Sequence, residues 1–146
     1  MSGREGECAI HRLVCDVAIV ATDRVLLVKY RDTSKYDGQR GWFLPDDFLQ
    51  HLEDPADAAG RIVREQLGVA LADARLDHVE SFGNGCWHLV FHYRTNLDSV
   101  PELAPSNNLL AAEWFGLSSL PGQAEWAHHG WGLDVLGSMG VVSPGG

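Results

Sequence analysis

The sequence has only three cysteines, and their spacing is typical of neither a disulfide framework nor a redox motif. Cys8, Cys15 and Cys86 are odd in number and form no Cys-x-x-Cys pair. We interpret them as reduced thiols of a cytoplasmic protein, with Cys15 in the core. The alternative for Cys86 is a nucleophile, but no base is recognisable beside it.

Long apolar runs and an excess of positive charge are also lacking. No segment is long and apolar enough to span a bilayer, and "MSGREGECAIHR" at the start lacks the hydrophobic core of a signal peptide. Basic residues number 11 and acidic residues 20, a net charge of −9, which argues against nucleic acid or an anionic membrane as the main partner. A nucleotide remains compatible, because a cation can bridge an acidic site to phosphates.

The composition is that of one ordinary globular domain. The chain has 146 residues, of which 45% are hydrophobic and 21% charged, enough for a substantial core. No repeat or low-complexity linker divides it. We expect a polar lead-in over 1–11, a single domain over 12–140 and a flexible tail over 141–146.

Runs of β-branched and apolar residues predict the strands. The segments 13–21 and 24–32 are joined by the turn residues "TDR" and predict a hairpin. A short strand is predicted over 42–45, and a further strand over 111–117. The segments "RLDHVESF" and "CWHLVFHYRT" flank "GNG" and predict a second hairpin.

The clearest helix is predicted over 54–67. Asp54 can cap it, Pro55 suits its first turn and Gly68 suits its C-terminal stop. A second helix is predicted over 122–139. Strands combined with one central and one terminal helix favour an α+β fold or an α-β-α sandwich. The inward face of the first helix is predicted to contain Ala58, Ala59, Ile62, Val63, Gln66 and Leu67.

The segment around this helix resembles the box of the Nudix hydrolase family. That box runs Gly, five residues, Glu, seven residues, Arg-Glu-aliphatic-x-Glu-Glu, x, Gly, aliphatic. The same frame is present here without a gap between positions 47 and 69. Six positions match, namely Glu53, Arg61, Val63, Glu65, Gly68 and Val69, and three differ, namely Asp47, Ile62 and Gln66.

The surroundings of the box extend the resemblance to about residues 12–121. "WFLP" at 42–45 precedes the box, and a Glu-Trp-Phe-x-Leu-x-x-Leu-Pro element follows at 113–121. The resemblance implies a Nudix-like fold with a mixed sheet and the box as loop–helix–loop. It also implies hydrolysis of a nucleoside diphosphate linked to another moiety, with Mg²⁺ or Mn²⁺ and an activated water.

The departures from the box fall where the family carries metal-binding carboxylates. Positions 62 and 66 are four apart, so they share one face of the helix. Mg²⁺ requires hard oxygen ligands in octahedral geometry, whereas Ile62 offers none and Gln66 offers a neutral carbonyl. At an effective dielectric of ~20, each unit charge lost from about 4 Å forfeits on the order of a few kcal/mol of attraction. The sequence therefore predicts a weak Mg²⁺ or Mn²⁺ site and weak or absent hydrolysis.

The resemblance carries over Glu53, Arg61 and Glu65 as catalytic candidates. In the family the first two form an ion pair that orients the loop and the helix, and Glu65 is a metal candidate. Asp46 and Asp47 stand where the family has Gly-Gly, a turn whose backbone carbonyl reaches the metal. Their carboxylates could replace the lost ligands, and the alternative is a helix-entry turn with solvated acids.

The strand at 86–95 supplies the candidate ligand-binding residues. A period of two places His88, His92 and Arg94 on one face, where they could meet an anionic ligand, with Trp42 at the core or at the pocket edge. The alternative is a half-open groove without a ligand role. A carboxylate from outside the box is a further family feature, and spacing does not separate its three candidates, Glu80, Glu102 and Glu113.

Other aromatic and histidine residues have two interpretations each. Trp87, Trp126 and Trp131 are candidates for stacking on a base or for a homodimer contact, with core packing as the alternative. His128 and His129 are expected on a solvated helix face, because adjacent helical residues point about 100° apart and cannot easily share a metal.

Three functional hypotheses remain open from the sequence. The first is a diphosphate hydrolase whose metal is held by Glu65, Glu53 and a carboxylate foreign to the box. The second is a binding or regulatory domain that recognises a nucleotide-like small molecule without cleaving it. The third is a repurposed, metal-free enzyme in the same cleft, since fold does not determine function.

Overall fold

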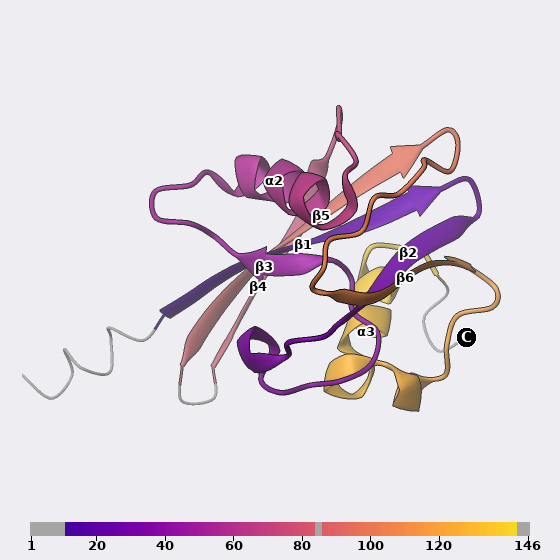
Figure 1. Ribbon diagram of the computed structural model, residues 1–146. Helices are drawn as coiled ribbons and strands as arrows, with labels where there is room; N and C mark the ends of the chain where they lie inside the picture. Colours follow the sequence, from indigo (N-terminus) through magenta and orange to yellow (C-terminus); the bar gives the residue numbers. More distant parts are fainter. Residues whose placement is uncertain (1–10, 84–85, 143–146) are drawn as a thin grey trace, which may run out of the picture.

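The computed structural model describes residues 11–83 and 86–142 and shows three layers (Figure 1). A six-stranded sheet lies between two helices, α2 (Pro55–Leu67) on one face and α3 (Trp131–Ser138) on the other. The predicted α-β-α sandwich is confirmed. Within the part of the chain that is described, no helix combines the length and apolarity needed to cross a membrane.

The sheet is mixed, as expected. Its order is β4-β5-β1-β2-β6, with β3 paired to β1 beside this path. The pairing of β1 with β5 is parallel and every other pairing is antiparallel. Both predicted hairpins are present. The strands are β1 (His11–Ala21), β2 (Arg24–Tyr30), β3 (Asp46–Phe48), β4 (Arg75–Gly83), β5 (Trp87–Leu97) and β6 (Leu109–Gly116).

Two apolar cores lie on the two faces of the sheet. The alternation of β1 sends Cys15 and Val17 toward α2, and Ala18 and Val20 toward α3. The apolar residues predicted for the inward face of α2 are buried, with Ile62 0% exposed, whereas Gln66 is only partly buried. Because the central part of β1 is covered on both faces, Asp16 on it is 1% exposed.

Helix α2 ends where the sequence predicts. Gly68 adopts φ 70°, and its N–H donates to the carbonyl of Arg64. Asp54 occupies the N-cap position, but its side chain makes no capping hydrogen bond. The first turn is therefore stabilised by Pro55 and by packing rather than by the aspartate.

The strand predicted over 42–45 is wrong. Trp42 and Phe43 each form only an isolated bridge, whereas the following three residues form β3. The antiparallel partner on β1, Val14 to Asp16, lies opposite Asp46 to Phe48, so the paired strand forms after Pro45 rather than before it. His11, which was expected in the lead-in, belongs to β1. Residues 1–10 and 143–146 lie outside the described ranges. Val141, which was expected in the tail, packs against the core on the α3 side.

The C-terminal helix is shorter than predicted. Two 3-10 turns, Gln123–Glu125 and Ala127–Gly130, precede α3. His128 and His129 have φ of 52° and 58°, a left-handed conformation that a right-handed helix cannot continue through. The expectation that this pair lies on a solvated helix face is therefore wrong.

Two glycines should respond to alanine in opposite directions. A Cβ at Gly60 of α2 would meet nothing within 4 Å, so Gly60→Ala should raise the free energy of unfolding by about 0.5–1 kcal/mol. Gly41 has φ +107°, and a Cβ there would lie 2.7 Å from the carbonyl oxygen of Glu125. Gly41→Ala should lower the free energy of unfolding. Urea titration followed by circular dichroism measures both; an unchanged Gly41→Ala would contradict this close approach.

Candidate functional site

Arg61 donates hydrogen bonds to both glutamates that the box retains. Its Nε and Nη2 donate to Glu53 at 2.8 and 3.1 Å, and its Nη1 donates to Glu65 at 3.0 Å. Nη2 also donates to the carbonyl of Phe48 at 2.9 Å. The hydrogen bond from Arg61 lowers the pKa of Glu53. The predicted contact between Glu53 and Arg61 is confirmed, and both glutamates are committed to one guanidinium.

Gln66 is bonded to the turn before the box. Its Nε2 donates to the backbone carbonyl of Asp46 at 2.9 Å, and its Oε1 accepts from the hydroxyl of Tyr30 at 2.9 Å. The hydroxyl of Tyr36 donates to the same Asp46 carbonyl at 3.2 Å, and the Asp46 N–H donates to the Tyr30 oxygen at 3.0 Å. Burial raises the pKa of both tyrosines, so they remain hydrogen-bond donors. Both lone pairs of the Asp46 carbonyl are thus in use.

The box does not fit Mg²⁺. Ile62 is sealed in the core on the α2 side, so position 62 presents no ligand. The backbone carbonyl that the resemblance assigns to the metal accepts an amide and a phenol instead. Glu65 faces Arg61 and is 55% exposed. A divalent ion there would face a guanidinium where it requires several oxygens in octahedral array.

The loop aspartates expected as metal ligands have separate surroundings. Asp47 contacts the ammonium of Lys35 at 2.8 Å and approaches Arg61 at 3.7 Å. Asp46 is 6% exposed and lies opposite Asp16 in the register of β3 with β1. Its carboxylate has no hydrogen-bond partner among the residues that the structure describes. Burial, with the charges of Asp16 and Asp47, raises the pKa of Asp46 well above its ordinary value.

A cleft of about 640 Å³ opens beside these aspartates. Its cations are already paired, Arg12 with Asp37 at 3.2 Å and Lys35 with the neighbouring acid of the loop. Asp46 and Glu80 are the lining acids without a lysine or arginine partner. Aromatic side chains form much of the remaining wall: Tyr36, Phe43, Phe48, Phe82 and Trp131.

The sequence-predicted ligand residues are not all brought together. His88 lines the cleft and stacks on Phe82 with ring centroids 5.0 Å apart. His92 is 0% exposed beneath the wall. Arg94 donates to the Met139 carbonyl at 3.0 Å, away from the lining residues.

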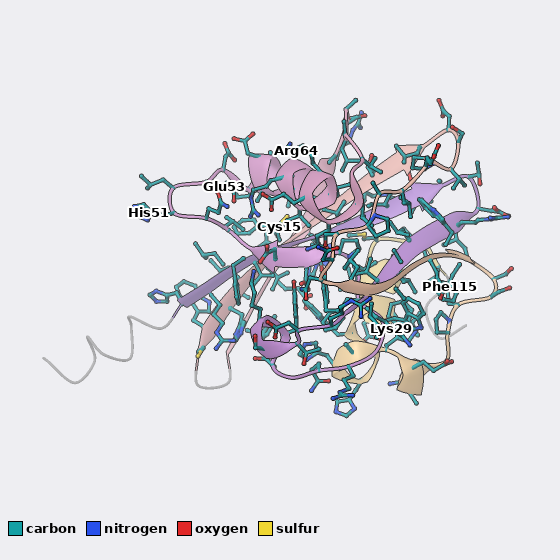
Figure 2. The ribbon with its side chains drawn as sticks, in the orientation of Figure 1. Cys15, Lys29, His51, Glu53, Arg64 and Phe115 are labelled. Carbon is teal, nitrogen blue, oxygen red and sulfur yellow. The ribbon has the colours of Figure 1, made fainter. Side chains whose placement is uncertain are left out.

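Trp42 packs in the core on the α3 side rather than in the cleft. Trp42 is 6% exposed, its ring meets the ring of Phe115 edge-on, and the Lys29 ammonium lies over it. Phe115 and Lys29 are labelled in Figure 2. Of the other tryptophans, Trp131 lines the cleft and Trp126 is buried, whereas Trp87 is 50% exposed. Core packing therefore accounts for Trp42 and Trp126, and the partly buried Trp131 also packs against the core on the α3 side.

Among the three acids proposed from outside the box, Glu80 is the one that lines the cleft. Glu102 and Glu113 are exposed elsewhere. Cys86 also lines the cleft, whereas Cys15 is buried as expected. Sequence reasoning missed a buried acid, Asp16. Its signal was a lone carboxylate inside the apolar run "LVCDVAIVA", because an acid there must have a partner.

Removing the guanidinium should destabilise the fold strongly. Arg61→Ala leaves Glu53, whose side chain is 12% exposed, without its partner, and we expect a loss of about 3 kcal/mol in the free energy of unfolding. Arg64→Ala is the matched control, since Arg64 is exposed on the outer side of the same helix (Figure 2). Chemical denaturation of both variants measures the difference. Equal losses would show that Arg61 has no special structural role.

The buried Asp46 should make stability depend on pH. Its folded pKa lies above the unfolded value, so its contribution rises as pH falls through the folded pKa and is lost at higher pH. Asp46→Asn should therefore have a higher Tm than the parent at pH values above the folded pKa, with the difference shrinking as the pH falls below it. The exposed Asp98→Asn is the control. Identical pH profiles for Asp46→Asn and the parent would contradict a buried, ionisable carboxyl.

Comparisons with known proteins identify the family. The model of the NUDIX domain matches residues 10–133. No curated protein matches the sequence. Among solved structures, the MutT NUDIX hydrolase from Burkholderia pseudomallei is 26% identical, with a TM-score of 0.69 over 91% of this chain and 98% of that one.

Two further structures share the fold at lower identity. The NUDIX domain of Shewanella oneidensis NrtR, complexed with ADP ribose, is 17% identical, with a TM-score of 0.60 over 74% of each chain. A bifunctional NMN adenylyltransferase/ADP ribose pyrophosphatase from Francisella tularensis, complexed with AMP and a manganese ion, is 16% identical. Its TM-score is 0.68 over 90% of this chain and 42% of that one. Together with the matched box frame, the domain match shows that this chain belongs to the NUDIX family.

Proposed function

We propose that this chain binds a nucleotide-like molecule in its cleft and hydrolyses diphosphates weakly or not at all by the family's metal-dependent route. One observation carries the proposal. The Asp46 carbonyl, which would reach a metal in the family, is held by Gln66 and Tyr36. A metal at this point would have to displace two hydrogen bonds, each with a net value of about 1 kcal/mol.

The charges of the remaining box groups also disfavour a metal. Glu53 and Glu65 would have to leave Arg61, and its positive charge would stay beside the incoming ion. Ile62 would contribute nothing. The loss of two helix carboxylates is therefore not offset by the carboxylates that survive.

The walls of the cleft support a ligand with a flat aromatic part. The stacked pair of Phe82 and His88, together with Trp131, offers ring faces on which a base can lie. The solved relatives complexed with ADP ribose and with AMP bind ligands of this kind. The lining cations are already paired, so a free diphosphate finds no unpaired positive charge, and the nucleoside part is the better match to this cleft.

A metal-free enzyme is the second candidate function, and Asp46 favours it. A buried carboxyl with a raised pKa that lines a cleft is a candidate to donate or accept a proton. Turnover in the presence of a chelator would distinguish this candidate from simple binding. Asp46→Asn should abolish such turnover.

Restoring the box acids tests the main proposal. The parent should show little heat with Mn²⁺ in calorimetry and little cleavage of ADP ribose. Ile62→Glu combined with Gln66→Glu should create Mn²⁺ binding, and it should destabilise the metal-free protein because a charge enters the core. Mn²⁺ should then raise the Tm of the double variant. Arg64→Glu adds a carboxylate to the exposed side of the same helix and is the matched control.

One result would reverse this account. If the parent binds Mn²⁺ tightly, and Asp46→Asn or Asp47→Asn abolishes that binding, the loop carboxylates have replaced the helix ligands. Hydrolysis of a nucleoside diphosphate derivative would then become the leading function.

A further inference from the structure

Two histidines and a glutamate meet on the β4–β5 hairpin, outside the box. His78 and Glu80 are two residues apart on β4 and so share a face. His92 on β5 is the direct cross-strand partner of His78. One ligand atom from each of these residues lies within 4.8 Å of the other two. Two imidazoles and one carboxylate form the donor set of several catalytic zinc centres.

A carboxylate on β1 orients the buried histidine. The Nδ1 of His92 lies 2.7 Å from Oδ1 of Asp16, and both side chains are at most 2% exposed. The other nitrogen, Nε2, faces Glu80 at 2.6 Å. Metal-binding histidines nearly always hold their second nitrogen on a carboxylate or a carbonyl, which fixes the ring and its tautomer. The contact with Asp16 supplies this arrangement for His92.

The second histidine has the same kind of support, and a β-bulge makes it available. Adjacent residues of a regular strand point to opposite faces, yet Asp77 Oδ2 lies 2.6 Å from Nδ1 of His78. The pairing of β4 with β5 shifts register between Leu76 and His78, so Asp77 is the extra residue. Such bulges re-aim side chains. This contact leaves the Nε2 of His78 available as a ligand.

We propose that His78, Glu80 and His92 bind a divalent transition metal, with Asp77 and Asp16 orienting the two imidazoles. Zn²⁺ and Fe²⁺ both accept two histidines and one carboxylate while keeping positions open. Mg²⁺ prefers an all-oxygen shell and is not expected here. The proposal rests on the hairpin and on β1, and it does not depend on the ligand proposed for the cleft.

Binding requires adjustments of up to about 1.5 Å, because the ligand atoms lie within 4.8 Å of one another rather than at tetrahedral spacing. Metal–ligand bonds of roughly 2 Å in tetrahedral array separate neighbouring ligand atoms by about 3.3 Å. The 2.6 Å contact between Glu80 and His92 must therefore widen by under about 1 Å. Glu80 is 37% exposed on β4, an edge strand, and can move. The metal would replace the proton held between these two atoms, so binding should release protons and weaken as pH falls.

The proposed metal site borders the cleft, so a bound metal could contact a ligand there. Glu80 lines the cleft, and its Oε1 also accepts from Nε1 of Trp131 at 3.2 Å. A metal held by Glu80 would add positive charge to a wall that is otherwise acidic. Its open positions would suit an anionic group of a ligand lying against the aromatic residues.

Metal content of the full-length chain tests the proposal. The metal-stripped protein is dialysed against Zn²⁺, against anaerobic Fe²⁺ and against Mg²⁺, and bound metal is then measured. We expect one equivalent of zinc or iron per chain and no magnesium. His78→Ala and Glu80→Gln should lose the equivalent, and Asp77→Asn should weaken binding by roughly 10- to 100-fold. Competition between zinc and iron in one dialysis identifies the preferred ion.

Two control variants separate this site from adventitious binding. His51→Ala removes an exposed imidazole from the loop before α2 (Figure 2), and His128→Ala removes one that lines the cleft outside the cluster. Both should retain the metal. The partly exposed His78 and Glu80, at 29% and 37%, can be replaced without opening the core, and circular dichroism verifies the fold.

The proposal is overturned if the parent binds no zinc or iron. It is equally overturned if His78→Ala and Glu80→Gln bind with parental affinity, or if the metal is lost in His128→Ala instead. Absorption of bound Co²⁺ gives an independent measurement, since its spectrum reports imidazole ligation in the parent and should change in His78→Ala. None of these readouts involves a nucleotide, so their failure is distinct from failure of the proposed ligand binding.

Discussion

The buried guanidinium of Arg61 is the interaction on which the arrangement of the box depends. A charged side chain that is only 9% exposed requires partners for its donors, and here two glutamates and a carbonyl accept from all three guanidinium nitrogens. These partners come from the helix, the loop before it and the end of β3. Holding them together fixes the turn at Asp46 against Gln66. The hydrogen bonds that occupy the Asp46 carbonyl are thus a consequence of the same ion pair.

The distribution of charge around the cleft follows from this commitment. Because the box acids face Arg61, the acidic groups left to the cleft come from the sheet: Asp46 from β3 and Glu80 from β4. Glu80 in turn contacts His92, which is held by Asp16 on the central strand. The acids of the cleft without a lysine or arginine partner therefore lie on strands of the sheet rather than on α2. Of the box positions, Asp47 also lines the cleft, whereas Glu53 and Glu65 do not.

Local patterns in the sequence predicted the elements, and contacts between distant elements were beyond them. Box spacing placed α2 and its stop at Gly68, because both are set within a few residues. The hydrogen bonds of Gln66 with Tyr30 join residues 36 positions apart, and no periodicity indicates them. The meeting of His78 and His92 was more accessible, since pairing outward from the "GNG" loop sets them opposite each other. The role of Asp16 required knowing that β1 and β5 are parallel neighbours, which a sequence without its tertiary fold does not reveal.

The two altered box positions have different physical consequences, and together they suggest a remade site rather than a damaged one. Ile62 is fully buried, which stabilises the fold by about 2–3 kcal/mol relative to an exposed side chain. Gln66 supplies a donor to a carbonyl that would otherwise be buried and unpaired, at a cost of about 1–3 kcal/mol. Simple loss of metal ligands would leave a cavity and orphaned polar atoms at the box. Across the described ranges, the buried side-chain nitrogen or oxygen without a partner is Nε of Arg94, which lies away from the box. The hydrogen bonds at the Asp46 carbonyl satisfy that oxygen and include two tyrosines from outside the box, whereas the Asp46 carboxylate, which lines the cleft, keeps its acceptors for a ligand or a proton.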